Sequence, residues 1–311
     1  MGWLWKPPHT FRKKIMTKQI DTLIPDIYSL LANGGGKIKE EDLKVFVDAV
    51  VHAVTEAVGV ENNLEPRAEL RLSKTGTGLR KVWFEHNLKF EKTSEVDPSV
   101  VGPNLMRFLT GHITEAALLL LAKTAGHTVE HEQKKVMLEG IPGHLDSVID
   151  GHTVDIKTAS QFSYAKFETG DIVWGKDPFG YVAQLSSYKK ALENEGIKTK
   201  DTSYFWAYNK SNSDMVLTPV DKNHLVDSEK KLREQKEVLA APEPPSELCF
   251  PEEEFGKSGN MVINKNCSFC PFKEICFKDA NEGKGLRKFK YSNGIQYLTK
   301  VVDKPKVEEI K

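Results

Sequence analysis

Several features are missing from this sequence of 311 residues, and each absence excludes a class of protein. The longest unbroken apolar run covers residues 116–122, far fewer than the roughly 20 residues that span a bilayer. Residues 1–8 contain no apolar core of a signal peptide. The sequence has no internal repeat and no collagen, coiled-coil or disordered composition. These absences predict a cytoplasmic protein without a membrane partner.

Net charge is also absent, since 44 basic residues balance 44 acidic ones. A protein that coats nucleic acid usually carries a large positive charge, whereas an enzyme needs basic residues along one groove only. Two local basic segments, 6–18 and 284–290, are either solvated tails or contacts to a nucleic-acid strand. The charge balance therefore disfavours a DNA coat protein more than it disfavours a DNA-processing enzyme.

The remaining composition, with 28% charged and 39% hydrophobic residues, is ordinary for a globular protein with a real core. Apolar periodicity and Gly/Pro signals predict alternating helices and strands, and thus an α/β (or α+β) fold with a central mixed sheet flanked by helices. We expect an N-terminal helical segment (1–66), a core (67–240) and a C-terminal cysteine module with a basic tail (241–311). Residues 1–15 show no helical or strand period, so we expect them to be disordered or to precede the true start at Met16.

The predicted elements follow in order along the chain. The second helix carries five valines largely on one side, Val45, Val47, Val51, Val54 and Val58, and the third is strongly apolar. Gly102 and Pro103 are predicted to open that third helix. The predicted helices cover 21–32, 39–58, 102–125, 178–195 and 221–240, and the predicted strands cover 133–138, a hairpin within 142–158, 202–208 and 215–219.

The hairpin is the most informative stretch. Asp150-Gly151 is a favoured two-residue turn, because both central residues must adopt positive φ. Pairing outward from that turn places Asp146 opposite Asp155 and His144 opposite Lys157. Opposed Cβ atoms lie about 4.5–5.5 Å apart, where like charges are destabilising. Apolar residues on both faces of the hairpin indicate a central strand pair rather than a solvent-facing ribbon.

Two facing carboxylates need a compensating charge. A divalent cation would remove the repulsion, and oxygen ligands suit Mg²⁺ or Mn²⁺. The alternative is a solvent-facing hairpin on which Lys157, two residues from Asp155 and on the same face, relieves the charge.

The order Asp146, hairpin, Asp155-Ile-Lys157 resembles the PD-(D/E)XK nuclease superfamily, in particular its RecB-like and phage exonuclease branch, although the literal Pro-Asp pair is missing. The resemblance spans roughly residues 67–208. It implies a restriction-endonuclease-like core in which Asp146 and Asp155 bind Mg²⁺ or Mn²⁺ and Lys157 orients and helps to deprotonate the attacking water.

Three further segments fit the same branch. Glu115 in Gly-His-Ile-Thr-Glu matches an upstream helix motif whose glutamate reaches the metal; a buried glutamate paired with a lysine is the alternative. Gln184 and Tyr188 resemble a downstream Gln-x-x-x-Tyr motif that grips the strand, although core packing would also explain this spacing. The segment before the catalytic helix implies phosphate contacts and base stacking by Arg71, Ser73, Lys74, Arg80, Lys81 and Trp83.

All four cysteines lie in the C-terminal third, at Cys249, Cys267, Cys270 and Cys276. In a cytosolic chain such clustering favours metal ligation over disulfides, and four thiolates suit tetrahedral Zn²⁺ or an iron–sulfur cluster. Unmodified structural cysteines are the alternative. The Cys-x2-Cys-x5-Cys tail resembles that of iron–sulfur RecB-like nucleases, which implies a [4Fe–4S] cluster. Those proteins place their first cysteine before the catalytic core, where residues 75–80 of this chain have none, so Cys249 would be the fourth ligand.

The sequence therefore predicts a metal-dependent DNA exonuclease for phage-type recombination or DNA processing. A structure-selective or CRISPR-adaptation-type endonuclease is the alternative within nucleases, and a non-catalytic DNA-binding or assembly module is the alternative outside them. DNA is the expected partner. The resemblance is also compatible with a homo-oligomer and with recombination or replication partner proteins.

Overall fold

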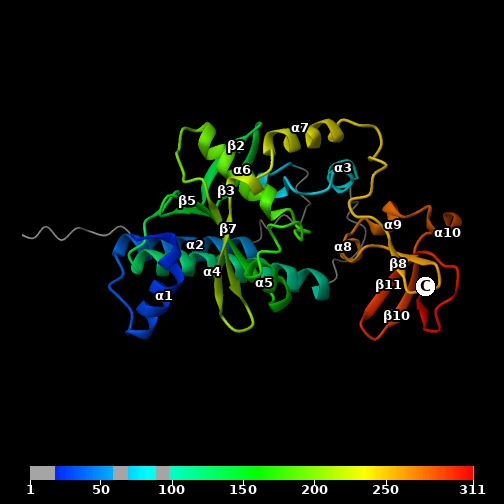
Figure 1. Ribbon diagram of the computed structural model, residues 1–311, viewed down its shortest axis with the longest axis horizontal. Helices are drawn as coiled ribbons and strands as arrows, with labels where there is room; N and C mark the ends of the chain where they lie inside the picture. Colours follow the sequence, from blue (N-terminus) through cyan, green and yellow to red (C-terminus); the bar gives the residue numbers. More distant parts are fainter. Residues whose placement is uncertain (1–17, 59–68, 89–97, 311) are drawn as a thin grey trace, which may run out of the picture.

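The computed structural model describes residues 18–58, 69–88 and 98–310, shown in colour in Figure 1. The expectations for residues 1–15, for a start at Met16 and for most of the basic segment 6–18 lie outside these ranges. Mixed α/β architecture, with a central mixed sheet flanked by helices, is confirmed.

The central sheet has five strands in the order β1-β4-β5-β6-β7. The middle strand, β5, pairs antiparallel with β4 and parallel with β6, so the sheet is mixed. Nearly every residue of β5 is buried, as its apolar residues on both faces predict. The strands are β1 (Val129–Glu130), β4 (Ser147–Ile149), β5 (His152–Ala159), β6 (Ser203–Asn209) and β7 (Met215–Val220).

Helices cover both faces of this sheet. On one face α1 (Leu23–Ala32) and α4 (Pro98–Thr124) pack on Val154, Ile156 and Trp206. On the other face α5 (Gln161–Glu168) and α6 (Tyr181–Asn194) pack on Phe205 and Ala207. Strand residues alternate between faces, so Asp155 and Lys157 lie on the face that α6 covers.

A two-stranded sheet and one more helix enclose α6 from the far side. Strands β2 (Lys134–Leu138) and β3 (Ile141–Leu145) pack with Tyr188 and Leu192 of α6 and with Leu232 of α7 (Ser228–Leu239). The remaining elements of this half are η1 (Ile20–Thr22), α2 (Glu40–Val58), η2 (Leu72–Lys74), α3 (Leu79–Asn87) and η3 (Lys222–His224).

The C-terminal part forms a second sheet, which the sequence analysis did not predict. Five antiparallel strands in the order β12-β10-β11-β9-β8 stand where a cysteine module and basic tail were expected. Figure 1 shows this part beside α3, away from α1. Its elements are β8 (Glu253–Phe255), β9 (Asn260–Val262), α8 (Lys265–Ser268), α9 (Lys273–Cys276), α10 (Ala280–Gly283), β10 (Arg287–Tyr291), β11 (Gly294–Lys300) and β12 (Glu309–Ile310).

The predicted turn of the hairpin is confirmed, but its outer register is wrong. Asp150 and Gly151 have φ of 49° and 83°, and Ile149 pairs with His152. The ladder ends at Ser147–Val154, one residue short of the expected pair of aspartates. His144 belongs to β3 and pairs with Lys135, not with Lys157, because the chain changes sheets at Asp146.

Two helices also differ from their predictions. Helix α4 begins at Pro98 and contains Pro103 within it, rather than opening there. Helix α2 packs along α4 and buries Ala53, while the five valines expected on one side are 38% to 74% exposed. The apolar pattern of α2 therefore extends beyond the face that the fold covers.

Within the described residues, one stretch, Gly102–Thr124 of α4, is long and apolar enough by length and composition to cross a membrane. The core helix of a soluble protein passes the same test. Leu118, Leu119 and Ala122 of this helix are buried against the central sheet, and Glu115 lies on it. The rest of the stretch is exposed or half-buried, with 17% of its most apolar window buried inside the structure.

Candidate active site

Asp155 and Lys157 form the centre of the site, side by side on one face of β5. The Nζ atom of Lys157 lies 2.6 Å from Oδ2 of Asp155, and the carboxylate is fully buried. Burial raises the pKa of Asp155, although the Lys157 ammonium opposes that rise. Burial alone would lower the pKa of Lys157, but Asp155 and Asp146 outweigh it and raise that pKa. Lys157 therefore carries a protonated, positively charged ammonium group next to Asp155.

Asp146 lies at the point where the chain passes from β3 to β4. Its Oδ2 accepts a hydrogen bond of 2.7 Å from the backbone N–H of Ile156, which fixes the carboxyl group beside β5. Burial raises the pKa of Asp146 well above its ordinary value, and the charges of Glu115 and Asp155 raise it further. Asp146 thus lies next to Asp155 because its side chain binds the backbone of Ile156, and not because the two aspartates pair across the strands.

Glu115 reaches the same cluster from α4. Burial raises its pKa to about 7, and Asp155 adds to that rise while Lys157 opposes it. The amide of Gln133 donates a hydrogen bond to Glu115 Oε1, and the backbone N–H of Gln133 donates to the carbonyl of Asp146. Gln133 has a φ of 48°, rare for a residue with a side chain. It holds two of the three carboxylate residues, and no sequence signal pointed to it.

Helix α6 supplies the other wall of the site. Gln184 Oε1 lies 3.4 Å from Lys157 Nζ, and Gln184 Nε2 donates to the hydroxyl of Tyr188 at 3.0 Å. The predicted face of Gln184 and Tyr188 therefore points at Lys157. Tyr181, one turn earlier, presents its ring 4.8 Å from Lys157 Nζ and was missed by the sequence analysis. Its spacing from Gln184, i and i+3, was the available signal.

Two of the six residues expected to contact DNA form contacts inside the protein. Trp83 is 9% exposed and donates its indole N–H to the carbonyl of Ala241, so its ring cannot stack on a base from this position. The guanidinium of Arg80 donates to Cys276 Sγ at 3.1 Å and to the carbonyl of Pro245. These contacts attach α3 to the C-terminal part of the chain.

The other four residues of that segment keep more solvent contact. Lys74 and Lys81 both form ion pairs with Glu85 and remain 36% and 40% exposed. Ser73 is exposed and Arg71 is half-buried. A phosphate contact by these side chains stays a prediction, whereas the contacts that the structure shows for Trp83 and Arg80 attach α3 to the C-terminal part.

The four cysteines are free, half-buried thiols. Burial raises the pKa of Cys267 to about 12, and the nearby thiols of Cys270, Cys249 and Cys276 raise it further. Residues 75–80, which lack a cysteine, approach this group through Gly78: a Cβ atom there would lie 2.6 Å from Cys249 Sγ. Cys249 therefore stands against residues 75–80, the segment where the resemblance noted in the sequence would place a first cysteine.

Among residues 18–58, 69–88 and 98–310, no group of three or more His, Cys, Asp or Glu side chains is arranged so that it could hold a metal ion as it stands. The donors at β5 nevertheless fit a hard divalent cation by their chemistry. The charge of Asp155 raises the pKa of both Glu115 and Asp146, and the buried Oδ1 of Asp155 has no hydrogen-bond partner among the described residues. The thiols fit a soft metal centre because sulfur is a soft ligand, and one of them, Cys276, accepts a hydrogen bond from the guanidinium of Arg80.

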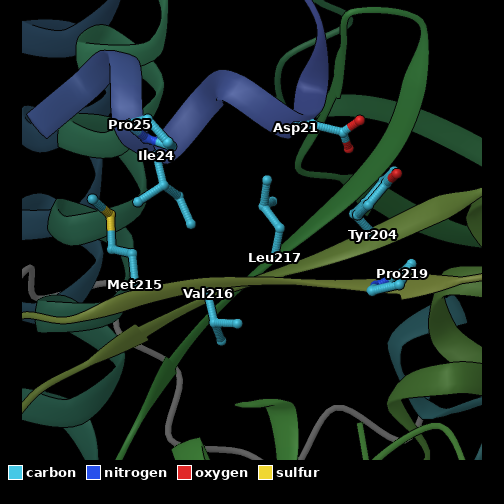
Figure 2. A pocket seen from close by; sticks show the side chains of 8 residues that line it. All are labelled: Asp21, Ile24, Pro25, Tyr204, Met215, Val216, Leu217 and Pro219. Atoms are coloured by element: carbon cyan, nitrogen blue, oxygen red, sulfur yellow. The ribbon is translucent and has the colours of Figure 1, made fainter. Parts of the chain in front are cut away.

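A separate hollow lies between α1 and the edge of the central sheet, with a volume of about 370 Å³. Figure 2 shows Leu217 pointing from β7 toward Ile24 of α1, while Val216 points to the opposite side of the strand. Its lining is mostly apolar, with Asp21 as its one acidic residue, and none of the residues of the carboxylate cluster line it. This hollow does not offer the groups needed for chemistry.

No family model matches this chain, and no curated protein does. Among solved structures, the crystal structure of SSO0001 is similar with a TM-score of 0.40 and 13% identity, over 75% of this chain and 95% of that one. Similarity at this level is silent on function.

Proposed function

We propose that this protein is a cytoplasmic, metal-dependent deoxyribonuclease of the PD-(D/E)XK superfamily that acts as an exonuclease on DNA ends. The proposal follows the resemblance of its sequence to the RecB-like and phage exonuclease branch. One observation carries the proposal. Glu115, Asp146 and Asp155 come from three separate segments and meet around Lys157, with the pKa of each carboxyl group raised. A buried group of like charges is costly to maintain, so an arrangement of this kind points to a functional site.

Glu115, Asp146 and Asp155 would hold Mg²⁺ or Mn²⁺. Such an ion, when bound, supplies charge stabilisation to a phosphoryl oxygen and activates a water molecule. The carboxylate oxygens of these residues are suited to it because Asp155 Oδ1 has no other hydrogen-bond partner among the described residues.

Lys157 contributes a positioned ammonium group. Because the neighbouring aspartates raise its pKa, it keeps its proton at neutral pH and can donate hydrogen bonds. We therefore propose that Lys157 orients the attacking water and a phosphoryl oxygen. It does not remove the proton of the water. Gln184 and Tyr188 fix the position of the ammonium through the chain of hydrogen bonds along α6. The proton released by the water would pass to a carboxylate of the cluster or to solvent.

Cys249, Cys267, Cys270 and Cys276 would hold a [4Fe–4S] cluster or Zn²⁺ with a structural role. Arg80 and Trp83 already attach α3 to the segments that carry these thiols. A metal centre there would add folding free energy to the same junction.

The test is cleavage of end-labelled linear DNA and of covalently closed circular DNA of the same sequence, with Mg²⁺ and with a chelator. We expect Mg²⁺-dependent loss of label from the linear substrate and no cutting of the circle. Cutting of the circle would identify an endonuclease instead. Binding to both substrates without cleavage under any divalent cation would support a DNA-binding module and contradict the proposal.

A further inference from the structure

Two stacked rings, Phe179 and Tyr181, lie between the solvent and Lys157 of the carboxylate cluster. Phe179 is 57% exposed, and its ring stacks on that of Tyr181 with centroids 5.3 Å apart and planes inclined by 29°. The ring of Tyr181 lies 4.8 Å from Nζ of Lys157, which in turn pairs with Asp155. Two ring contacts therefore separate an exposed aromatic face from the ammonium group that we place next to the scissile phosphate.

The loop that carries Phe179 is held firmly on both sides. The carboxylate of Asp177 accepts hydrogen bonds from the backbone N–H groups of Phe179 and Val182, at 3.2 and 2.9 Å. Gly180 has a φ of 74°, and a Cβ atom there would lie 2.4 Å from Cα of Gly76, so the two backbones touch. This exposed ring is thus fixed in place, and fixing it before binding lowers the entropy lost when a flat ligand stacks on it.

An exposed ring of this kind matches the face of an unpaired nucleobase. Base–aromatic stacking is tolerant of sequence, since every base has a π-face. A base inside an intact duplex has both faces covered, so the ring can be reached only by a base at an end or in a single strand. Exposed single aromatic residues are common on protein surfaces; the difference here is the contact through Tyr181 to Lys157.

We propose that Phe179 is a stacking platform for the unpaired base next to the scissile phosphate. This inference rests on the proposed nuclease function and specifies its substrate further: the strand end must present a splayed base at the site. Phe179 binds and positions the nucleotide and takes no part in bond cleavage.

The experiment combines a ring substitution with removal of the base. End-labelled single-stranded oligonucleotides are prepared with an abasic residue at each of the first three positions from either end. With wild-type protein and Mg²⁺, we expect one abasic position to lower kcat/KM about tenfold, as loss of one stacked base should. Phe179→Ala should lower kcat/KM on the intact strand by a similar factor and be insensitive to the abasic residue at that position.

Two variants control for other effects. Phe179→Tyr keeps an aromatic face and should recover most of the kcat/KM that Phe179→Ala loses, together with the sensitivity to the abasic residue. Trp174→Ala removes another exposed ring, 72% accessible and packed on His224, and should change neither quantity. A melting scan of each variant verifies folding, and truncation of a ring as exposed as Phe179 should leave the midpoint nearly unchanged.

The outcomes are distinct. If Phe179→Ala and the abasic residue reduce kcat/KM independently, or if Phe179→Ala equals wild type, the stacking platform is wrong while the nuclease assignment stands. If wild type cleaves nothing, the proposed function fails. Stacking is then tested by titrating oligonucleotides that contain 2-aminopurine with protein in chelator and recording their fluorescence. Quenching by wild type but not by Phe179→Ala supports the stacking platform. Equal quenching by both proteins overturns it.

Discussion

The ammonium of Lys157 lies 2.6 Å from the carboxylate of Asp155, and both groups are in the interior of the sheet on its central strand. A second lysine–aspartate pair, Lys176 with Asp171, has the same 2.6 Å separation but is 65% and 37% exposed. Removing one member of a buried ion pair destabilises a protein far more than removing one member of an exposed pair. The remaining charge of a buried pair has neither a partner nor water around it, whereas an exposed charge is solvated.

Lys157→Met should therefore destabilise the protein by roughly 3–5 kcal/mol in chelator, since it leaves buried carboxylates without a counter-charge. Lys176→Met should change stability by less than about 1 kcal/mol. Urea denaturation of both variants compares them directly. Equal, small losses would mean that Asp155 is neutral or solvated, which contradicts a buried ion pair between Lys157 and Asp155.

Asp146 offers a test of charge against hydrogen bonding. Asp146→Asn keeps an oxygen that can accept the N–H of Ile156 and removes the charge that Glu115 and Asp155 oppose, so we expect a higher melting temperature in chelator at pH 8. Asp146→Ala loses the acceptor as well and should melt lower than wild type. A lower melting temperature for the asparagine variant would show that the carboxylate itself is a structural partner.

The raised pKa of Glu115 predicts how stability depends on pH. Its folded-state pKa of about 7 lies above the ordinary 4.5, so the folded state retains a proton that the unfolded state has lost between these values. The free energy of unfolding should therefore fall as the pH rises from about 4.5 to 7, by about 3 kcal/mol at most, and then level off. Denaturation in chelator from pH 4.5 to 8 measures this slope. Glu115→Gln should flatten part of it, with the remainder due to Asp146 and Asp155; an unchanged slope in this variant would refute the assignment.

Gly78 tests the thiol group without altering a cysteine. A methyl group at this position would lie 2.6 Å from Cys249 Sγ and 2.9 Å from its Cβ, so one of the two backbones has to move. We expect Gly78→Ala to lower the bound iron or zinc to well under one centre per chain and to make Cys249 reactive toward a thiol reagent. Gly283→Ala is the matched control, because a Cβ there meets no atom within 4 Å, although its positive φ adds some strain. Full metal content in Gly78→Ala would exclude Cys249 as a ligand.

The fold and site differ in how far the sequence predicted them. The turn at Asp150-Gly151 and the pairing of Ile149 with His152 follow from local chemistry, and both are present. The switch of sheets at Asp146 does not follow from it, because β3 prefers β2 as its partner for reasons of tertiary packing with Leu72 and Leu192. The hydrophobic pattern of residues 141–149 does not specify which strand they pair with.

Other departures have the same origin. Trp83 and Arg80 occur in a basic-aromatic segment whose composition suits nucleic acid, yet their partners, Ala241 and Cys276, lie more than 150 residues away in the chain. Gln133 joins Glu115 to Asp146 only after three segments have assembled. Contacts of this range are set by the folded topology, and periodicity within a short window carries no information about them.

The central claim is that Glu115, Asp146, Asp155 and Lys157 act together in metal-dependent DNA cleavage. The most direct measurement is the single-turnover rate on end-labelled linear DNA with Mg²⁺ for wild type, Asp155→Asn and Lys157→Met, each verified as folded at the assay temperature. We predict Mg²⁺-dependent cleavage by wild type and a loss of about 10³-fold or more in both variants. Cleavage by either variant at near the wild-type rate would contradict the account.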